Sequence, residues 1–274
     1  MTESSKEMDL TSNQVDAFLQ SIDVRLGNDK MSNLQTIVSN FMEYVPFQNL
    51  TMLIGPRRRP KWNEICDDLI SGIGGLCTAR NPFLKVLLQK LGYDVYFISS
   101  SMIEPDCHIG LVVTIDSTKY WIDVGNGYPY NFPYRLGSGD VIVHPFMNYR
   151  VVKRDETWFV EHEFNDSGQW KINQTFKDKE VPYSFFDNMH ELHYTVEDYG
   201  PFLRGLRANR WWKFGGIILR DELVNDLESE HKISDISDFK KWIRQLFPSS
   251  PINDNEITEK AWNAYTSLEL EVII

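Results

Sequence analysis

The hydrophobic pattern of the chain changes its period at Gly92. Before that residue, apolar side chains recur every three or four positions, as over residues 15–22, which is the spacing of one helical face. After it the chain turns to short runs rich in β-branched and aromatic residues, beginning at 95–98. Because helices come first and strands follow, alternating βαβ units are excluded. The sequence therefore predicts an α+β fold.

The same pattern divides the chain into three parts. Residues 1–92 are predicted to form a helical bundle, residues 93–195 an antiparallel β-barrel, and residues 196–274 an α/β lid. The strand-like runs of the barrel are 95–98, 109–115, 120–124, 141–143, 149–153, 157–160 and 170–172. In the last part we expect helices over 238–247 and 257–268, and the alternation of residues 268–272 suggests a final strand.

The charge of the chain restricts its partners. The formal net charge is −11, which excludes a general nucleic-acid surface because phosphate binding needs accumulated Lys and Arg. The run Arg57-Arg58-Arg59, between two prolines, is the exception. We interpret it as a solvated loop, with a local seat for a phosphate-bearing ligand as the alternative.

The cysteines and the N-terminal residues indicate a compartment. Residues 1–9 have no apolar signal core, and no apolar run is long enough to cross a bilayer. The sequence therefore predicts a cytoplasmic protein with no membrane partner, whose thiols Cys66, Cys77 and Cys107 stay reduced. No metal site is expected, because there is no C-x-x-C pair and only Cys107 and His108 are adjacent.

A glycine-rich turn delivers Cys77 to the start of a helix. The sequence Gly74-Gly75-Leu76-Cys77 precedes a run that is apolar almost all round, so the helix is expected to be buried. The unpaired N–H groups and the dipole of a helix N-terminus favour a thiolate there. The same N–H groups, including that of Cys77, would stabilise an oxyanion on a substrate carbonyl that the glycines allow to approach.

His108 and Asp123 are expected on one face of a β-hairpin. Each lies on a strand-like run, and residues 116–119 lie between the runs. An even-length turn puts Asp123 on the face of His108, opposite Val112 for a four-residue turn or opposite Gly110 for a two-residue turn. An odd-length turn would put the two side chains on opposite faces.

Each of these three residues also has a purely structural interpretation. A cysteine at the start of an apolar helix can be a small buried hydrophobe. His108 can be a satisfied core histidine, and Asp123 can be a turn or cap residue. Only the conjunction of Cys77, His108 and Asp123 favours a nucleophile, a base and an orienting acid.

Five segments of the chain resemble the arylamine N-acetyltransferase family. The family's nucleophile motif, Arg-Gly-Gly-x-Cys-x-Glu-x-Asn, stands here at residues 73–81, with Cys77 as its cysteine. Its other motifs stand in the family's order: Pro-Phe-Glu-Asn-Leu at 46–50, Leu-Gly-Tyr/Phe-x-Val at 91–95, His-x-x-Leu-Val at 108–112 and Asp-Val-Gly-Phe-Gly at 123–127. The resemblance covers residues 15–134.

The resemblance implies a helical bundle, a β-barrel and an α/β lid around a cysteine-protease-like Cys-His-Asp core. It implies a ping-pong reaction in which acetyl-CoA acetylates Cys77, CoA leaves, and an arylamine or arylhydrazine takes the acetyl group. His108 would be the base, and Asp123 would hold its imidazole. The further site residues that it implies are Gly125 and Gly127 beside CoA, and Phe47 and Asn126 in the substrate pocket.

The chain departs from the family motifs at four positions. Gln48 and Ile73 stand where the family has Glu and Arg, Ala79 replaces the Glu after the cysteine, and Asn126 replaces a Phe. We interpret the joint loss of the first two charges as compensated, because no buried charge is left alone. The polar Asn126 indicates an unusual acceptor preference.

Two other functions fit the same residues. A transglutaminase-like enzyme or an amide synthase uses the same order of Cys, His and Asp, although a transglutaminase-type site has Trp after the cysteine and this chain has Thr78. A catalytically silent binding protein of the same fold is the second alternative, in view of the charges missing at Gln48, Ile73 and Ala79. The sequence leaves the acceptor amine, the acyl chain length and the oligomeric state open.

Overall fold

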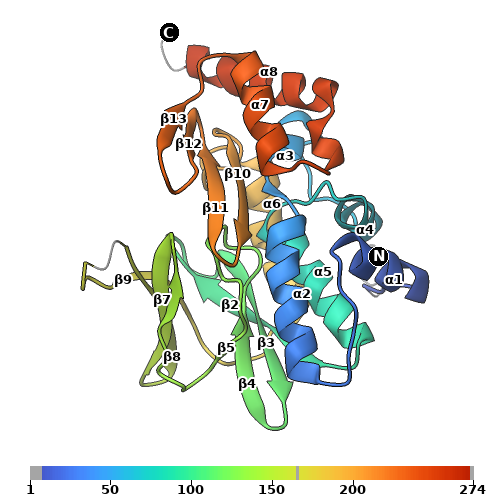
Figure 1. The fold of residues 1–274 in the computed structure, drawn as a ribbon, viewed down its shortest axis with the longest axis vertical. Helices are drawn as coiled ribbons and strands as arrows, with labels where there is room; N and C mark the ends of the chain where they lie inside the picture. The colour runs from blue at the N-terminus through green and yellow to red at the C-terminus, as the bar shows by residue number, and fades with distance from the viewer. Residues whose placement is uncertain (1–7, 165–166, 272–274) are drawn as a thin grey trace.

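Helices come first in the structure and a curled sheet follows, as the hydrophobic pattern predicts. The computed structural model describes residues 8–164 and 167–271. In Figure 1 the N-terminal helices lie beside the curled sheet, and a second sheet with two helices lies at the C-terminal end. The α+β fold class is therefore confirmed.

Capping groups in the sequence mark the start of the first N-terminal helix and the end of the last one. Thr11 and Gln14 form a capping box at the start of the first helix. Gly92 follows the last one with φ of +79°, a left-handed conformation that ends a helix. These helices are α1 (Ser12–Ser21), α2 (Lys30–Tyr44), α3 (Leu50–Ile54), α4 (Trp62–Ile70) and α5 (Cys77–Lys90).

The middle of the chain forms one curled antiparallel sheet. Its strands are β2 (Asp94–Ser101), β3 (His108–Ile115), β4 (Thr118–Ile122), β5 (Tyr134–Arg135), β6 (Ile142–His144), β7 (Met147–Arg154), β8 (Thr157–Glu163) and β9 (Lys171–Phe176). Their order is β5-β4-β3-β2-β9-β8-β7-β6. Within the described residues no pairing joins the end strands β5 and β6, so the predicted barrel is an open, curled half-barrel (Figure 1).

The hairpin of β3 and β4 has a two-residue turn. Its register leaves only residues 116–117 unpaired, and both have positive φ, as this turn requires. Continuing the register puts Asp123 opposite Gly110, which is one of the two alternatives that the sequence allowed. Asp123 therefore lies on the same face of the hairpin as His108.

The second sheet is antiparallel and combines strands from both ends of the chain. It contains β1 (Phe47–Gln48), β10 (Arg207–Trp212), β11 (Gly215–Arg220), β12 (Leu223–Asn225) and β13 (Glu230–Lys232), in this order. The remaining elements are η1 (Tyr183–Phe186), α6 (Asp187–Thr195), α7 (Ile236–Leu246), η2 (Pro251–Asn253) and α8 (Asn255–Glu271). Because β1 comes from the N-terminal part, the three-part division of the chain stays a prediction.

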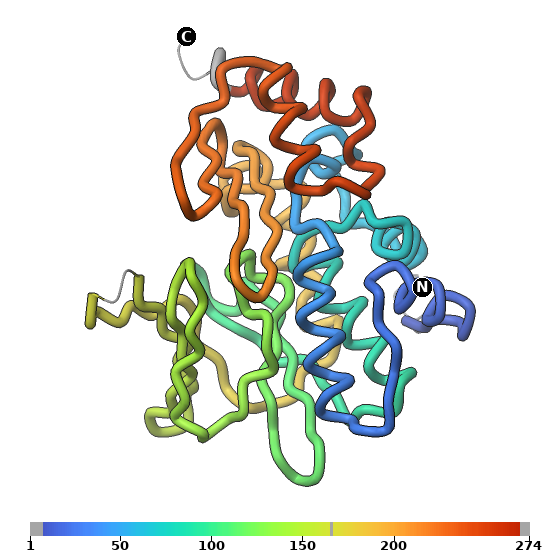
Figure 2. The backbone as a smooth tube through the Cα atoms, in the orientation of Figure 1, coloured from blue at the N-terminus to red at the C-terminus, as the bar shows by residue number. Residues whose placement is uncertain are grey.

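The hairpin of β10 and β11 connects the C-terminal part to the curled sheet. In Figure 2 this orange segment extends from the C-terminal part toward the green strands. On β10, Asn209 Nδ2 and Trp211 Nε1 donate to the carbonyl oxygen of Gly127 at 2.9 and 3.0 Å. The hairpin therefore fixes the loop that follows Asp123.

Separate apolar clusters stabilise these parts. The largest packs α1, α2, α4 and α5 against β2 and β3. A second lies between α3, α7, α8 and the second sheet, and in it α7 buries the four residues of its apolar face, namely Phe239, Trp242, Ile243 and Leu246. The third fills the curled sheet with aromatic residues.

The strand expected over residues 268–272 is wrong wherever the structure describes it. Residues 268–271 continue α8, and Val272 lies outside the described residues. Alternation of Leu and Glu is compatible with a helix, because both residues favour helices. The preceding turns of α8 are held in the second apolar cluster by Ala261 and Tyr265, so the helix continues into these residues.

None of the helices in the described ranges is long and apolar enough to span a membrane.

Candidate active site

Backbone hydrogen bonds hold the turn before Cys77. The N–H of Gly74 donates to Asp68 O and that of Gly75 to Pro46 O, each at 3.1 Å. Gly74 has φ of +80°, and a Cβ atom at this position would lie 2.0 Å from Pro46 O. Only glycine fits there, so the predicted glycine turn is a requirement of the backbone path.

Cys77 lies at the buried N-terminus of α5, and its residue is 4% exposed. Its N–H precedes the hydrogen-bond ladder of the helix, so it is free to bind an oxyanion. Gly125 packs directly against it, since a Cβ atom at Gly125 would lie 2.6 Å from Cys77 Cα. Close packing with the nucleophile thus requires glycine at position 125.

His108 lies between Cys77 and Asp123. Its Nε2 is 2.6 Å from Asp123 Oδ2, and the Cys77 side chain is close enough to contribute to the raised pKa of the imidazole. His108 is 3% exposed and Asp123 is completely buried. The structure therefore brings together the thiol, the imidazole and the carboxylate that the sequence singled out.

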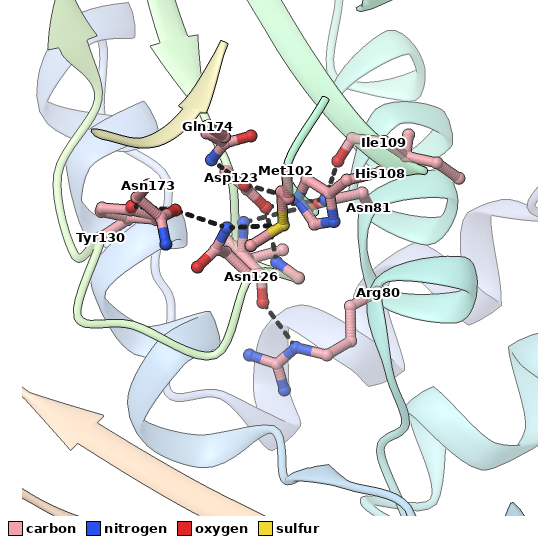
Figure 3. A network of polar contacts seen from close by, with 12 residues as sticks. Arg80, Asn81, Met102, His108, Ile109, Asp123, Asn126, Tyr130, Asn173 and Gln174 are labelled. Carbon is pink, nitrogen blue, oxygen red and sulfur yellow. Dashed lines mark hydrogen bonds and ion pairs between the residues drawn. The ribbon is translucent and has the colours of Figure 1, made fainter. Parts of the chain in front are cut away.

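Donors from four residues saturate the carboxylate of Asp123. Oδ1 accepts from Asn81 Nδ2 at 2.9 Å and from the N–H of Gly125 at 3.0 Å. Oδ2 accepts from Gln174 Nε2 at 2.9 Å in addition to His108 (Figure 3). A buried charge is tolerated only with such compensation.

This arrangement shifts the pKa values of His108 and Asp123 in the directions that favour an ion pair between them. Burial alone would lower the pKa of His108, but the charge and hydrogen bond of Asp123, with a further contribution from Cys77, hold it well above its usual value. Burial alone would raise the pKa of Asp123, but His108 and the amide donors hold it below its usual value. The site therefore favours an imidazolium beside a carboxylate.

Asn81 fixes the position of Asp123 relative to α5. Its Nδ2 also donates to Ile109 O at 2.6 Å, and its Oδ1 accepts from the N–H of Val124 at 3.0 Å. The sequence motif contains Asn81, but sequence reasoning gave it no role. The signal that could have found it is an Asn one turn after the cysteine, near the start of a helix that the sequence predicts to be buried. Gln174 on β9 was also missed, and its strand offers no comparable signal.

Arg80 is a second buried group beside the site. Its Nε donates to Val124 O at 2.6 Å, and its Nη1 donates to Val45 O at 2.5 Å. The guanidinium stacks over the ring of Phe41. Burial lowers the pKa of Arg80 to about 9, against the opposing effect of the Asp123 charge. Arg80 thus connects α5 to the segment after Asp123 (Figure 3).

A cavity of about 420 Å³ opens at Cys77. The curled sheet, the loop after β2, the segment before β10 and the β10–β11 hairpin provide its walls. The predicted site residues that line it are Phe47, Cys77, His108, Gly125, Asn126 and Gly127. Asp123 lies behind His108, outside this lining.

Asn126 is oriented by a polar chain that leads away from the cavity. Its Nδ2 donates to Asn173 Oδ1 at 3.1 Å and contacts Met102 Sδ at 3.7 Å (Figure 3). The hydroxyl of Tyr130 donates to the same Asn173 oxygen at 3.0 Å and contacts His162 Nε2. The amide of Asn126, a residue that lines the cavity, is therefore held in one orientation.

Three of the four residues that depart from the family motifs lie around the nucleophile turn. Gln48 is 1% exposed, and its Nε2 donates to Ile73 O at 3.2 Å and to Thr51 Oγ1 at 3.0 Å. Its Oε1 accepts from the N–H of Thr51 at 3.2 Å. Ile73 packs onto the second apolar cluster, and Ala79 is 6% exposed. A neutral amide therefore satisfies the backbone at a point where the family has a charged pair.

The arginine run does not form a phosphate seat in the cavity around Cys77. Arg58 pairs with both oxygens of Glu64 at 2.7 and 2.8 Å, and Arg59 pairs with Asp187 and stacks on Tyr183. No group of three or more His, Cys, Asp or Glu side chains in the described part of the chain is placed to hold a metal ion.

Comparison with known proteins agrees with this geometry. A family profile described as N-acetyltransferase matches residues 30–248. The pineal gland arylamine N-acetyltransferase isozyme NAT-10 of Gallus gallus is 25% identical over 167 residues, which are 57% of this chain and 57% of that enzyme. The chain thus spans little more than half the length of this curated relative.

Solved structures share the fold over almost the whole chain. The arylamine N-acetyltransferase of Salmonella typhimurium superposes with a TM-score of 0.81 at 18% identity, covering 94% of this chain and 99% of that one. The Mycobacterium marinum enzyme in complex with CoA gives 0.81 at 20% identity, covering 93% and 99%. With the family profile spanning most of the sequence, the chain is a member of the arylamine N-acetyltransferase family.

Proposed function

We propose that the protein transfers acetyl groups from acetyl-CoA to arylamines or arylhydrazines, with Cys77 as the acetyl carrier. The observation that carries the proposal is the position of His108, buried between Cys77 and Asp123 at the wall of a cavity. CoA bound to the Mycobacterium marinum relative supports acetyl-CoA as the donor.

The first half of the reaction forms the thioester on Cys77. In the thiolate–imidazolium pair, the Cys77 sulfur attacks the carbonyl carbon of acetyl-CoA, and the N–H of Cys77 stabilises the oxyanion. The bond between the carbonyl carbon and the CoA sulfur then breaks. His108 gives its proton to the departing CoA thiolate, and Asp123 keeps the imidazole oriented throughout.

The second half transfers the acetyl group to the amine. Neutral His108 accepts a proton from the amine nitrogen as that nitrogen attacks the thioester. The bond from the carbonyl carbon to Cys77 breaks, and the amide product leaves. The enzyme returns to its thiolate–imidazolium state, because the proton now on His108 replaces the one given to CoA.

The two glycines after Asp123 are the residues that we assign to the donor. Gly125 and Gly127 line the cavity beside Cys77, and their close packing on Cys77 and Phe47 holds this backbone where the CoA arm would pass. A Cβ atom at Gly127 would lie 3.1 Å from Phe47 Cζ, which would narrow the pocket that we assign to the acceptor ring. Asn126 adds a fixed amide there, which favours acceptors that carry a polar substituent.

Intact-protein mass measurement after incubation with acetyl-CoA tests the proposal. We expect one acetyl group on the wild-type protein, lost when an arylamine or a hydrazine is added, and no thioester with Cys77→Ser. The matched control is Cys66→Ser, which should still be acetylated, because Cys66 is buried in α4 and burial raises its pKa to about 12. An unmodified wild-type protein with a titratable free thiol would show a silent binding protein instead.

The pH dependence of Cys77 alkylation gives an independent test. Because Asp123 keeps His108 protonated, iodoacetamide should react with Cys77 well below about pH 8.5, where an ordinary thiol loses its thiolate. Peptide mapping at a series of pH values measures this rate for each cysteine. A rate for Cys77 that follows an ordinary thiol titration would contradict the ion pair.

A further inference from the structure

A second cavity lies on the other side of the nucleophile turn. It holds about 300 Å³ and lies between α3, α4, the turn at Gly74 and Gly75, and α6. Cys77, His108 and Asp123 do not line it. Any ligand in this cavity would contact the turn that presents the thiol without occupying the acetyl-transfer site.

Asp68 gives this cavity an uncompensated negative charge. The residue is half-buried, and within residues 8–164 and 167–271 its carboxylate has neither an ion pair nor a side-chain hydrogen bond. Burial, with added repulsion from Glu64 and Asp67, raises the pKa of Asp68 to about 6. At neutral pH the cavity therefore holds a carboxylate with no partner of its own.

Among the described residues that line this cavity, no cationic side chain is free to pair with this carboxylate. Arg58 is the one cationic side chain among the lining residues, and both oxygens of Glu64 engage its guanidinium. Tyr194 is neutral and hydrogen-bonds to Thr78. The counter-charge for Asp68 must therefore come from solution.

The other walls of the cavity are mostly apolar or satisfied. The amide of Gln48 is fully used by Ile73 O and Thr51. The apolar lining consists of Met52, Pro56, Pro60, Ile65, Leu76 and Ala79. Such a lining accepts a flat or short apolar body, while one carboxylate selects a single positive charge.

One departure from the family motif contributes to the open space. Ala79, where the motif has Glu, presents only a methyl group to the cavity, and Gly74 and Gly75, which match the motif, present no side chain. Ile73 packs away onto the second apolar cluster. Where the family motif has two carboxylates and a guanidinium, this chain leaves a cavity and one unpaired Asp68.

We propose that this cavity is a binding site for a small organic monocation, an amidinium, guanidinium or primary ammonium group on a compact apolar body, with Asp68 as its counter-ion. A forked cation such as an amidinium matches the two oxygens of one carboxylate. This site is distinct from acetyl transfer and does not depend on it.

Titration calorimetry with benzamidine and with its neutral analogue benzamide tests the proposal. Wild-type protein should bind one benzamidine saturably and should not bind benzamide. Asp68→Asn should weaken the binding by about tenfold or more. Asp67→Asn, which makes the same change at the exposed neighbour on α4, should alter the affinity by less than about twofold.

Two further measurements place the ligand and guard against misfolding. Protein alkylated at Cys77 should keep its affinity for benzamidine, because the site lies outside the acetyl-transfer cavity. Ala79→Leu fills the second cavity with Asp68 intact and should also abolish binding. Benzamidine binding that is absent from the wild type, or equal in Asp68→Asn and wild type, would overturn the proposal. Calorimetry reads binding directly, so a failed acetyl transfer leaves this result interpretable.

Discussion

Two carboxylates, one on each side of the nucleophile turn, lie in opposite environments. On one side Asp123 is completely buried and accepts hydrogen bonds from four residues. On the other side Asp68 is half-buried and has no partner in the described part of the chain. The turn at Gly74 and Gly75 and the first turn of α5 lie between these two carboxylates.

The difference reflects how much solvent each carboxylate keeps. A fully buried carboxylate without donors would cost several kcal/mol, so Asp123 exists only with its network. That network also fixes the imidazole of His108 in one orientation. Asp68 stays partly hydrated, so it can remain ionised without donors and is available to a solute. The hydrogen bonds around Asp123 therefore fix the geometry of the imidazole, whereas Asp68 remains accessible to a solute.

Removal of the charge at Asp123 should give the largest effect. Asp123→Asn would place an amide among donors, so His108 loses its orientation and its ion pair, and we expect kcat to fall by about 10³- to 10⁴-fold. Steady-state acetyl transfer measures this. Asp116→Asn makes the same change in the exposed turn of the same hairpin and should leave kcat unchanged. Retention of more than about a tenth of kcat by Asp123→Asn would contradict the role of the carboxylate.

Truncation of Asn81 should lower the free energy of unfolding more than it affects the reaction. Asn81→Ala leaves Asp123, Ile109 O and the N–H of Val124 each short of one partner in a dry site, at a cost of about 3 kcal/mol in unfolding free energy. Urea denaturation measures the loss. Asn33→Ala, at a partly exposed position of α2, is the control and should cost less than about 1 kcal/mol. An equal loss in both variants would show that the Asp123 network adds nothing.

Restoration of the family's Glu and Arg at positions 48 and 73 tests the side of the turn that faces Asp68. Gln48→Glu replaces the amide that donates to Ile73 O with a buried carboxylate and should cost about 2 kcal/mol. Ile73→Arg in the Gln48 background should also destabilise the fold. The double variant should lose less than the sum of the two, as a double-mutant cycle on melting data would show. A clear gain in Tm from Ile73→Arg alone would mean that the guanidinium has found Asp68, and this gain should vanish with Asp68→Asn.

Neutralisation of Asp68 should give the smallest effect, and its sign depends on pH. Because the pKa of Asp68 is raised to about 6 in the fold, ionisation destabilises the protein as the pH rises from about 4 to 6, and the penalty is complete above that range. Asp68→Asn removes the penalty, so it should raise Tm slightly at pH 7.5 and leave it nearly unchanged at pH 4. Thermal melts of wild type, Asp68→Asn and Asp67→Asn at both pH values measure this. A Tm gain that is larger at pH 4 would contradict the assigned shift.

Local patterns predicted the elements that carry the site. Helical periodicity and a glycine stop located α5, and the turn before Cys77 follows from two glycines that the backbone path requires. Period-two alternation with an even-length turn put His108 and Asp123 on one face. The same local reasoning gave a strand at residues 268–271, where Leu and Glu continue a helix, because alternation alone does not exclude a helix that the core extends.

Local patterns in the sequence were enough to predict the order of most helices and strands, the nucleophile turn and the identities of the thiol, imidazole and carboxylate. Each of these features depends on the spacing of residues within one segment of the chain, so the sequence alone shows it. Three further features appear only in the packed molecule: Gln174 and Asn81 satisfy Asp123, β1 joins a C-terminal sheet, and Asp68 borders a second cavity. Those contacts join residues far apart in the chain, so burial and partners exist only once the segments have packed.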